Sequence, residues 1–398
     1  MSVVEGCEQT CSTAAEESVA AGGPAVCTRC VMDARAPGLS FDAQGVCNFC
    51  SMQDRLEAEY PLGEVGEMRL QAIAEKIKRK GRRRKFDCIV GVSGGRDSSY
   101  CLYYAKVVLG LRPLAVHFDN GWDSDIAKNN IRKICEKLDV ELHTIIADWE
   151  ESRELTNCTI RACVPYIDLT DDVGIASALY RTAANEGIKY ILLAHSFREE
   201  GITPLAWNYF DGRYVRSLIR QFARQPLRHF KNVDLHHMAW WIFAKGIRVV
   251  NVPNYYDDRG VNVERLLERE LDLVDTGQHH YDNEIFALVY HYARHKFGFD
   301  WRVVELSARV RTGVLTRGQA LKILEQEPFF ENREVVGYCL KKQGWTWEEY
   351  EAILRAPNRY FTDYPTWYPL LKLFKAPIRW LSRANVLPGH TYEKYFEA

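Results

Sequence analysis

Residues 86–110 read FDCIVGVSGGRDSSYCLYYAKVVLG, and this stretch determines the fold that the sequence predicts. Residues 86–92 are a mostly apolar run that leads into a glycine-rich turn, and residues 98–110 then have a helical pattern that stops at Gly110. A short apolar run bounded by a Gly-rich turn is typical of a buried strand. The stretch therefore predicts a strand, a loop and a helix in direct succession.

The same succession continues toward the C-terminus. Strands are expected at 111–119, 140–148, 189–194 and 247–252, with helices at 124–138 and 175–185. Strands that alternate with helices imply βαβ units and a parallel sheet, and strands without polar alternation fit a sheet covered on both faces. We therefore predict a Rossmann-like α/β fold, followed from residue 281 by a mainly helical region rich in Trp and Tyr.

Length and charge exclude several classes of protein. The 398 residues suggest two to three domains at roughly 150 residues each, and 47% apolar with 26% charged residues rule out wholesale disorder. A net charge of −1 excludes a globally basic nucleic-acid coat. No apolar run approaches the roughly 18 residues of a membrane-spanning helix, and residues 1–26 contain no Lys or Arg to begin a signal peptide. A cytoplasmic protein with reduced cysteines and no membrane association is expected.

Changes in composition divide the chain into five segments. We expect a flexible tail at 1–26, a zinc-ribbon-like module at 27–52, a helical and basic linker at 53–85, the sheet domain at 86–280 and the helical region at 281–398. In the linker, eight of the ten residues from 76 to 85 are Lys or Arg. Such a run is more often a solvated helix end than a nucleic-acid surface, and it lacks interleaved aromatic residues. Nucleic acid is therefore not expected as a partner.

Four of the twelve cysteines have the spacing of metal ligands. Cys27 and Cys30 form one CxxC pair, Cys47 and Cys50 form a second, and 16 residues separate the pairs. Two tight turns of this kind can close a tetrahedral site of four thiolates, as in zinc ribbons. So short a module needs a metal in place of a core, so structural Zn²⁺ is expected, with an iron–sulfur cluster as the alternative.

The loop 93–99, SGGRDSS, has the features of a phosphate-binding turn. Its glycines let the backbone turn tightly, and successive N–H groups at a helix N-terminus attract phosphate oxygens. Three serine hydroxyls add further donors. The stretch has neither the GxxxxGK pattern of a Walker loop nor the GxGxxG pattern of a dinucleotide site, which excludes these two classes.

This loop resembles the PP-loop, SGGxDS, of the N-type ATP pyrophosphatases, a group that includes asparagine synthetase, GMP synthetase and tRNA thiolation enzymes. The resemblance implies that the β- and γ-phosphates of ATP are held as pyrophosphate with Mg²⁺, while the α-phosphate is open to attack by a substrate oxygen. It assigns to ATP the residues Ser93, Gly94, Gly95, Asp97, Ser98 and Ser99, with Asp119 near the adenosine. Asp97 is also a candidate catalytic residue.

Segments on both sides of the loop resemble one branch of this superfamily, the N-acetyl sugar amidotransferases of surface-polysaccharide (lipopolysaccharide O-antigen) biosynthesis. They are CTRCVMD at 27–33, FDAQGVCNFC at 41–50, LRPLAVHFDNGW at 111–122, GIKYILLAHSFREEGITPLAW at 187–207 and HHYDN at 279–283. The resemblance implies that the acetamido group of a sugar, nucleotide-linked or acidic, becomes an acetamidino group. Adenylylation makes the amide oxygen a leaving group, ammonia displaces AMP, and pyrophosphate is the second product.

Polar residues after the strand expected at 189–194 are further candidates. His195 ends that strand at the edge where ligands bind in open α/β sheets, and Glu199 and Glu200 follow. We assign His195 and Glu200 to the catalytic centre, Glu200 as a ligand of Mg²⁺ or as the group that deprotonates incoming ammonium. The candidate substrate contacts are Trp207, His280 and Tyr281, although a core position also fits Trp207 and a helix cap fits the His280 segment.

The nitrogen donor is expected to come from outside the chain. The sequence shows neither an N-terminal cysteine nor a free block for a Cys-His-Glu glutaminase. Ammonia is therefore expected from solution or from a separate glutaminase subunit, and the resemblance adds a cyclase-like channel subunit as a partner.

Cys158 and Cys163 keep a second function open. The tRNA thiolation enzymes of the same superfamily use cysteines beside the PP-loop domain to carry sulfur or to hold a cluster. Burial as small apolar residues is the alternative interpretation, and the one that we favour.

Overall fold

The computed structural model describes residues 26–257, 261–274, 283–326, 328–384, 386–387 and 390–398. The expected tail up to residue 25 and the candidates His280 and Tyr281 lie outside these ranges. Within the described ranges, no helix has the length and apolar character needed to cross a membrane.

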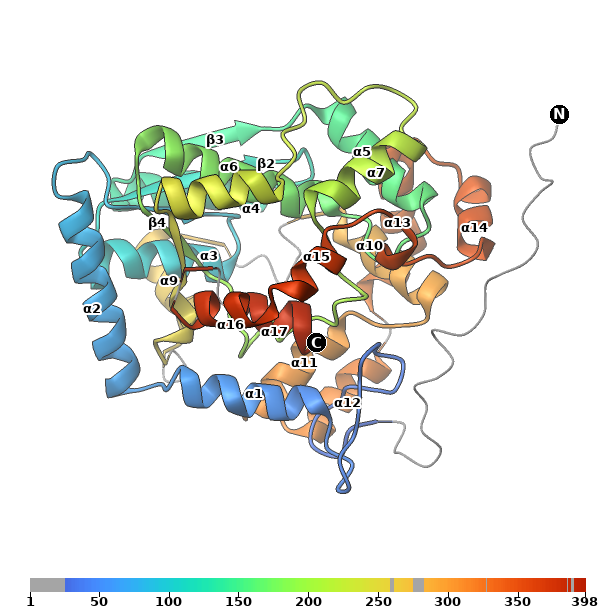
Figure 1. The fold of residues 1–398 in the computed structure, drawn as a ribbon, viewed down its shortest axis with the longest axis horizontal. Coiled ribbons are helices and arrows are strands. Elements are labelled where there is room, and N and C mark those ends of the chain that lie inside the picture. The colour runs from blue at the N-terminus through green and yellow to red at the C-terminus, as the bar shows by residue number, and fades with distance from the viewer. Residues whose placement is uncertain (1–25, 258–260, 275–282, 327, 385, 388–389) are drawn as a thin grey trace.

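Five parallel strands form the predicted sheet. They are β1 (Cys88–Gly91), β2 (Pro113–Asp119), β3 (Leu142–Ile146), β4 (Tyr190–Leu193) and β5 (Arg248–Asn251). Their order is β3-β2-β1-β4-β5, so the chain builds outward from β1 in one direction and then returns to its other side (Figure 1). Ile89 of β1 accordingly pairs with Leu114 of β2 and Ile191 of β4. The reversal between β1 and β4 is the place where open α/β sheets bind ligands, beyond the carboxyl ends of the strands.

Helices cover both faces of this sheet. Val90 and Leu192 belong to one core together with residues of α3 (Arg96–Tyr103) and α4 (Asp125–Leu138). Their strand neighbours Ile89 and Ile191 belong to a second core together with α6 (Leu169–Glu186). Successive strand residues point to opposite faces, so a sheet buried on both faces needs apolar residues without alternation. This explains why the strands could be predicted as continuous apolar runs.

The remaining helices follow the sheet elements in three groups. Near the N-terminus are α1 (Asn48–Glu59) and α2 (Glu64–Gly81). Between and after the strands are α5 (Trp149–Arg161), α7 (Gly212–Phe222), α8 (Leu235–Ala239) and α9 (Val263–Leu271). The C-terminal region contains α10 (Phe286–Tyr292), α11 (Arg302–Arg311), α12 (Arg317–Glu325), α13 (Arg333–Gln343), α14 (Trp347–Arg355), α15 (Tyr368–Leu373), α16 (Lys375–Arg383) and α17 (Thr391–Phe396), and is helical as predicted.

The basic run of the sequence ends α2 and continues into the following turn. Residues 82–85 are exposed, and Lys85 forms an ion pair with Glu141. The run is a solvated helix end, the interpretation that its composition favoured.

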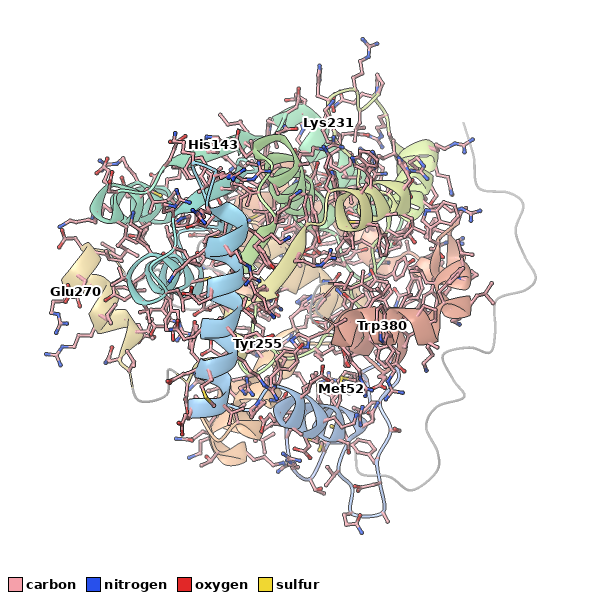
Figure 2. The ribbon with its side chains drawn as sticks, turned by 60° about the vertical axis from the view of Figure 1, so that its left-hand side comes forward. Met52, His143, Lys231, Tyr255, Glu270 and Trp380 are labelled. Carbon is pink, nitrogen blue, oxygen red and sulfur yellow. The ribbon has the colours of Figure 1, made fainter. Side chains whose placement is uncertain are left out.

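The two ends of the described chain meet beside the sheet. Tyr60, which follows α1, packs edge-on against Tyr255, labelled in Figure 2, with ring centroids 5.4 Å apart. His390, just before α17, lies 5.8 Å from the ring of Tyr60 and 5.0 Å from the ring of Phe197. The C-terminal segment therefore packs close to the carboxyl edge of β4, although it is far from that strand in sequence.

Candidate active site and metal centre

The predicted phosphate loop follows β1 and leads into α3. Two of its three hydroxyls lie together: Ser93 Oγ and Ser98 Oγ are 3.1 Å apart, and the Ser93 backbone N–H donates to Ser98 Oγ over 3.1 Å. Ser93 Oγ also accepts from the Gly95 N–H at 3.4 Å. These contacts hold a compact loop at the N-terminus of α3, which is the arrangement that binds phosphate oxygens.

Gly94 allows this loop to press against α4. Its φ of +81° lies in the left-handed region, and a Cβ there would stand 2.2 Å from the backbone oxygen of Ala127. The side chain of Asn130, one turn further along α4, donates to Gly94 O at 3.0 Å and to Val274 O at 2.8 Å. Sequence reasoning missed Asn130, although a buried amide within the apolar stripe of an amphipathic helix is a visible signal.

Arg96 links the loop to two other segments. Its guanidinium contacts Asp97 at 2.7 Å, Glu199 at 2.7 Å and Glu264 at 3.0 Å. Burial acts to lower the pKa of Arg96, but Asp97 and Glu199 raise it above its ordinary value. Arg96 is therefore a permanent counter-ion for the carboxylates beside the loop. The motif SGGxDS did not indicate this role, because Arg96 occupies the variable position x.

The other residues assigned to ATP lie at the same edge. Asp119 ends β2 and accepts from the Gly121 N–H at 2.8 Å. Ser99 is buried within α3, and its hydroxyl has no partner among the described residues. The roles of both residues in nucleotide binding stay predictions.

His195 and Glu200, assigned to the catalytic centre, form an ion pair. His195 follows β4, and a turn in which the Glu200 N–H donates to Ser196 O brings the two side chains together. Glu200 raises the pKa of His195 above its ordinary value, against the opposing effect of burial. The pair can therefore hold or release a proton at the carboxyl edge of the sheet.

A pocket of about 270 Å³ lies at the point where the strand order reverses. Asp97 of the loop and Ala194, Ser196 and Glu199 after β4 form one part of its wall. The segment after β5, the N-terminal helices and the end of α11 complete it through Tyr256, Asp257, Glu57, Leu62, Arg311 and Thr312, among others. We call this the edge pocket, and it joins three predicted segments of the chain.

The structure gives less information about the candidate substrate residues. Trp207 is buried and stacks on Phe299 with ring centroids 3.8 Å apart and an interplanar angle of 5°. One face of the indole is therefore occupied by the core. Sugar stacking by Trp207 stays a prediction, as do substrate contacts of His280 and Tyr281, which lie outside the described residues.

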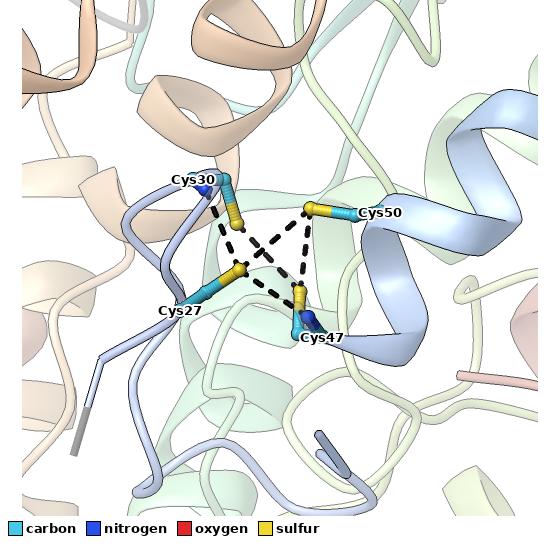
Figure 3. Close-up of side chains that lie close together, drawn as sticks. All are labelled: Cys27, Cys30, Cys47 and Cys50. Carbon is cyan, nitrogen blue, oxygen red and sulfur yellow. Dashed lines mark hydrogen bonds between the residues drawn. The ribbon is translucent and has the colours of Figure 1, made fainter. Parts of the chain in front are cut away.

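The four predicted ligand cysteines converge on one point, as Figure 3 shows. The Sγ atoms of Cys30 and Cys47 are 3.6 Å apart, those of Cys47 and Cys50 are 3.6 Å apart, and those of Cys27 and Cys50 are 3.8 Å apart. Backbone N–H groups of Cys30 and Cys47 point at Cys27 Sγ. All four cysteines are fully buried.

This donor set fits one metal ion. Metal–sulfur bonds of about 2.3 Å in a tetrahedron separate the sulfurs by about 3.8 Å, close to the distances seen. A cluster in which each cysteine binds a different iron would hold the sulfurs farther apart. Four thiolates leave no open position for substrate, so the ion would be structural.

Two arginines of the C-terminal region contact the cysteine module, and no sequence motif indicated either of them. Arg311 at the end of α11 donates to Cys30 Sγ at 3.3 Å and Cys50 Sγ at 3.4 Å. Arg317 of α12 donates to the backbone oxygens of Cys27 and Cys30, both at 3.0 Å. Because Arg311 also lines the edge pocket, the module, α11 and the pocket form one connected structure.

Cys158 and Cys163 are both buried. Burial raises the pKa of Cys158 to about 12, and burial also raises the pKa of Cys163. Reactive cysteines are thiolates in electropositive, accessible surroundings. The structure therefore agrees with the packing role for Cys158. Beside Cys163, Lys296 and Arg359 act to lower the pKa of the thiol against the effect of burial, so its packing role stays a prediction.

The C-terminal part of the chain matches a known family. Residues 278–377 fit the family described as LPS biosynthesis protein WbpG-like, C-terminal domain. This region is similar to the WbpG-like C-terminal domain. The match confirms the resemblance predicted from the sequence. The WbpG-like domain contains α11 and α12, so it supplies part of the edge pocket and holds the cysteine module.

More distant similarities extend over most of the chain. It is 20% identical over 309 residues to the uncharacterized protein MJ1599 of Methanocaldococcus jannaschii, covering 75% of this chain and 93% of that protein. The solved U34-tRNA thiolase NcsA of Methanococcus maripaludis, with its 4Fe–4S cluster, is 14% identical with a TM-score of 0.30, covering 66% of this chain and 82% of that one. NAD+ synthetase of Burkholderia pseudomallei is 16% identical with a TM-score of 0.26, covering 56% and 99% respectively. Because these TM-scores are low, no function is transferred from the two solved structures to this chain.

Proposed function

We propose that the protein is an ATP-dependent amidotransferase that converts the acetamido group of an N-acetyl sugar into an acetamidino group during lipopolysaccharide biosynthesis. The observation that carries this proposal is the compact SGGRDSS loop at the carboxyl edge of β1, in a chain that also has a WbpG-like C-terminal domain. The loop supports use of ATP, and the domain supports a sugar of surface polysaccharide as substrate.

The first step is adenylylation of the amide oxygen. A lone pair of that oxygen forms a bond to the α-phosphorus, the bond from that phosphorus to the bridging oxygen breaks, and pyrophosphate leaves. The backbone N–H groups and the hydroxyls of Ser93 and Ser98 would bind the leaving pyrophosphate. Asp97 would bind the Mg²⁺ that accompanies ATP, and Mg²⁺ would offset the charge on the phosphates.

The second step replaces the activated oxygen by nitrogen. Ammonia attacks the amide carbon, the carbon–oxygen bond breaks, and AMP leaves with the former amide oxygen. One proton must leave the nitrogen, and the His195–Glu200 pair is suited to take it. The ammonia would come from solution or from a separate glutaminase with a cyclase-like channel subunit.

We propose Zn²⁺ as the ion of the cysteine site. Four thiolates with tetrahedral spacing are the donor set of structural zinc. The ion would fix the N-terminal module against α11 and so support the wall of the edge pocket.

A direct assay tests the proposal. The full-length protein is incubated with ATP, ammonium chloride and a panel of nucleotide-linked N-acetyl sugars. We expect AMP and pyrophosphate, and a sugar product whose mass has fallen by the difference between O and NH. Formation of ADP, or turnover of ATP with no change in the mass of any sugar, would contradict the proposal.

A cysteine variant separates amidation from sulfur transfer. Cys158→Ala should keep its kcat, because the thiol only packs, and should lose stability to the same extent as Cys88→Ala, a control at an equally buried position. Loss of turnover in Cys158→Ala alone, with an intact fold, would favour sulfur chemistry.

A further inference from the structure

Three buried oxygen atoms near His195 have no hydrogen-bond donor among the described residues. They are Oδ2 of Asp168, Oδ2 of Asp172 and Oδ1 of Asn208. Asp168 is only 2% exposed. Buried polar atoms are nearly always paired, so three unpaired acceptors in one place indicate that a bound group supplies the donors.

The start of α6 brings these atoms together. Asp168 is the residue before the helix, and Asp172 lies one turn on, so both carboxylates stand on the same side of the helix end. The hydroxyl of Tyr166 and the amide of Asn208 both donate to the carboxylate of Asp172. The acceptor oxygen of that amide is left without a partner, which adds a third acceptor beside the two carboxylates.

The surroundings of these atoms also favour a bound cation. We define the acidic cluster as Asp168, Asp172, His195, Glu200 and Lys394: Asp172 interacts with both His195 and Lys394, and Glu200 pairs with His195. Burial raises the pKa of both Asp168 and Asp172, which means that their charged forms are poorly stabilised by the protein alone. A cation that also offers N–H donors would stabilise these charged forms.

The cluster lies beside the edge pocket. The side chain of His195 lies deep in the molecule but faces open space, and its chain neighbours Ala194 and Ser196 line the edge pocket. A small cation could enter beside His195 and would then stand next to the place where the adenylylated amide is expected.

We propose that the acidic cluster is the binding site for ammonium, the nitrogen donor of the reaction; this inference rests on the proposed amidotransferase function. Ammonium offers four N–H donors, no acceptor and one positive charge, which complements three unpaired acceptors of which two belong to buried carboxyl groups. One N–H proton passes to Oδ2 of Asp172, the electron pair of that bond stays on nitrogen, and neutral ammonia attacks the adenylylated carbon. The proton then leaves to solvent through His195.

Binding is tested on the full-length protein without ATP or sugar. Ammonium chloride is titrated at constant ionic strength against potassium chloride while Tm and the relaxation of ¹⁵N-labelled ammonium are measured. We expect ammonium alone to raise Tm, and Asp172→Asn to weaken ammonium binding at least tenfold. Asp125→Asn, the same substitution in the exposed first turn of α4, is the control and should bind as the wild type does. Equal stabilisation by potassium, or unchanged binding in Asp172→Asn, would overturn the proposal.

Kinetics then distinguish this site from the proposed function. In Asp172→Asn the KM for ammonium should rise at least tenfold, while the KM for ATP should stay within twofold. Turnover with an unchanged KM for ammonium would contradict the ammonium site alone. Ammonium binding that depends on Asp172, in a wild-type protein that modifies no N-acetyl sugar, would contradict the proposed function alone.

Discussion

Gly94 is the residue at which the phosphate loop and α4 come closest, and it gives a sharp test of the loop. In Gly94→Ala the new Cβ would collide with the backbone of Ala127, so the loop must move. Since a displacement of about 1 Å can cost about 100-fold in rate, we expect ATP turnover to fall by about that factor.

Gly344 provides a matched control for this substitution. It has the same φ of +81°, but nothing lies within 4 Å of the Cβ position. Gly344→Ala should therefore lose about 1 to 2 kcal/mol of stability from backbone strain alone and keep its turnover. Equal loss of turnover in both variants, measured as AMP release, would show that strain rather than loop position matters.

Asp168 makes stability depend on pH. Burial, followed by the charge of Asp172, raises the pKa of Asp168 to about 7, whereas an Asp in an unfolded chain titrates near pH 4. Below pH 4 the group makes its full contribution to the free energy of unfolding, and this contribution is lost as the pH rises toward 7. In ammonium-free buffer, the free energy of unfolding should fall across that window.

Asp168→Asn removes this titration. The variant should match the wild type near pH 4 and exceed its stability at pH 8, by an amount on the order of 4 kcal/mol. Chemical denaturation at a series of pH values measures the difference. A variant that is less stable than the wild type at pH 8 would show that the Asp168 carboxylate is already paired in the folded protein.

At the scale of elements, α11 holds the cysteine module in place. Burial acts to lower the pKa of Arg311, but the thiolates of Cys30, Cys50 and Cys47 raise it, so its charge is permanent. Arg311→Met removes the hydrogen bonds to the sulfurs of Cys30, Cys47 and Cys50 and should cost about 2 kcal/mol. Metal should also be lost faster during dialysis against a chelator.

Arg309→Met is the control for this effect. Arg309 lies on the same helix and pairs with Glu305 over 3.4 Å. This variant should keep its metal content, measured by elemental analysis, and its denaturation midpoint. The docking role of Arg311 would be refuted if both variants retained metal equally well.

Elements that their own apolar pattern specifies could be predicted from the sequence, whereas an element that depends on distant contacts could not. The five strands and α4 were predicted because their apolar pattern alone specifies them. By contrast, α5 was missed because its stability depends on a distant loop: the buried carboxylate of Glu151 accepts N–H groups of Arg228, His229 and Phe230 at 2.6 to 2.9 Å. A carboxylate that caps a loop more than 70 residues away leaves no local pattern.

For the whole molecule, the sequence predicted the separate parts but not their assembly. The loop, the cysteine quartet and the individual residues His195 and Glu200 were expected from the sequence. The structure brings the serines of the loop and the four cysteines together, and it adds that His195 and Glu200 form an ion pair. The contact of Arg311 with Cys30 spans 281 positions, and His390 reaches Tyr60 from the opposite end of the chain. Such contacts depend on how helices pack, which spacing along a single chain does not encode.

The central claim is that the amide oxygen of the sugar attacks the α-phosphate of ATP, and following that oxygen tests the claim most directly. A nucleotide-linked N-acetyl sugar, labelled with ¹⁸O in its acetamido group, is incubated with the full-length protein, ATP and ammonium. If the amide oxygen attacks the α-phosphate, the AMP that is released must carry the ¹⁸O, and the sugar must lose it. AMP without the label, or ADP as the nucleotide product, would contradict the account.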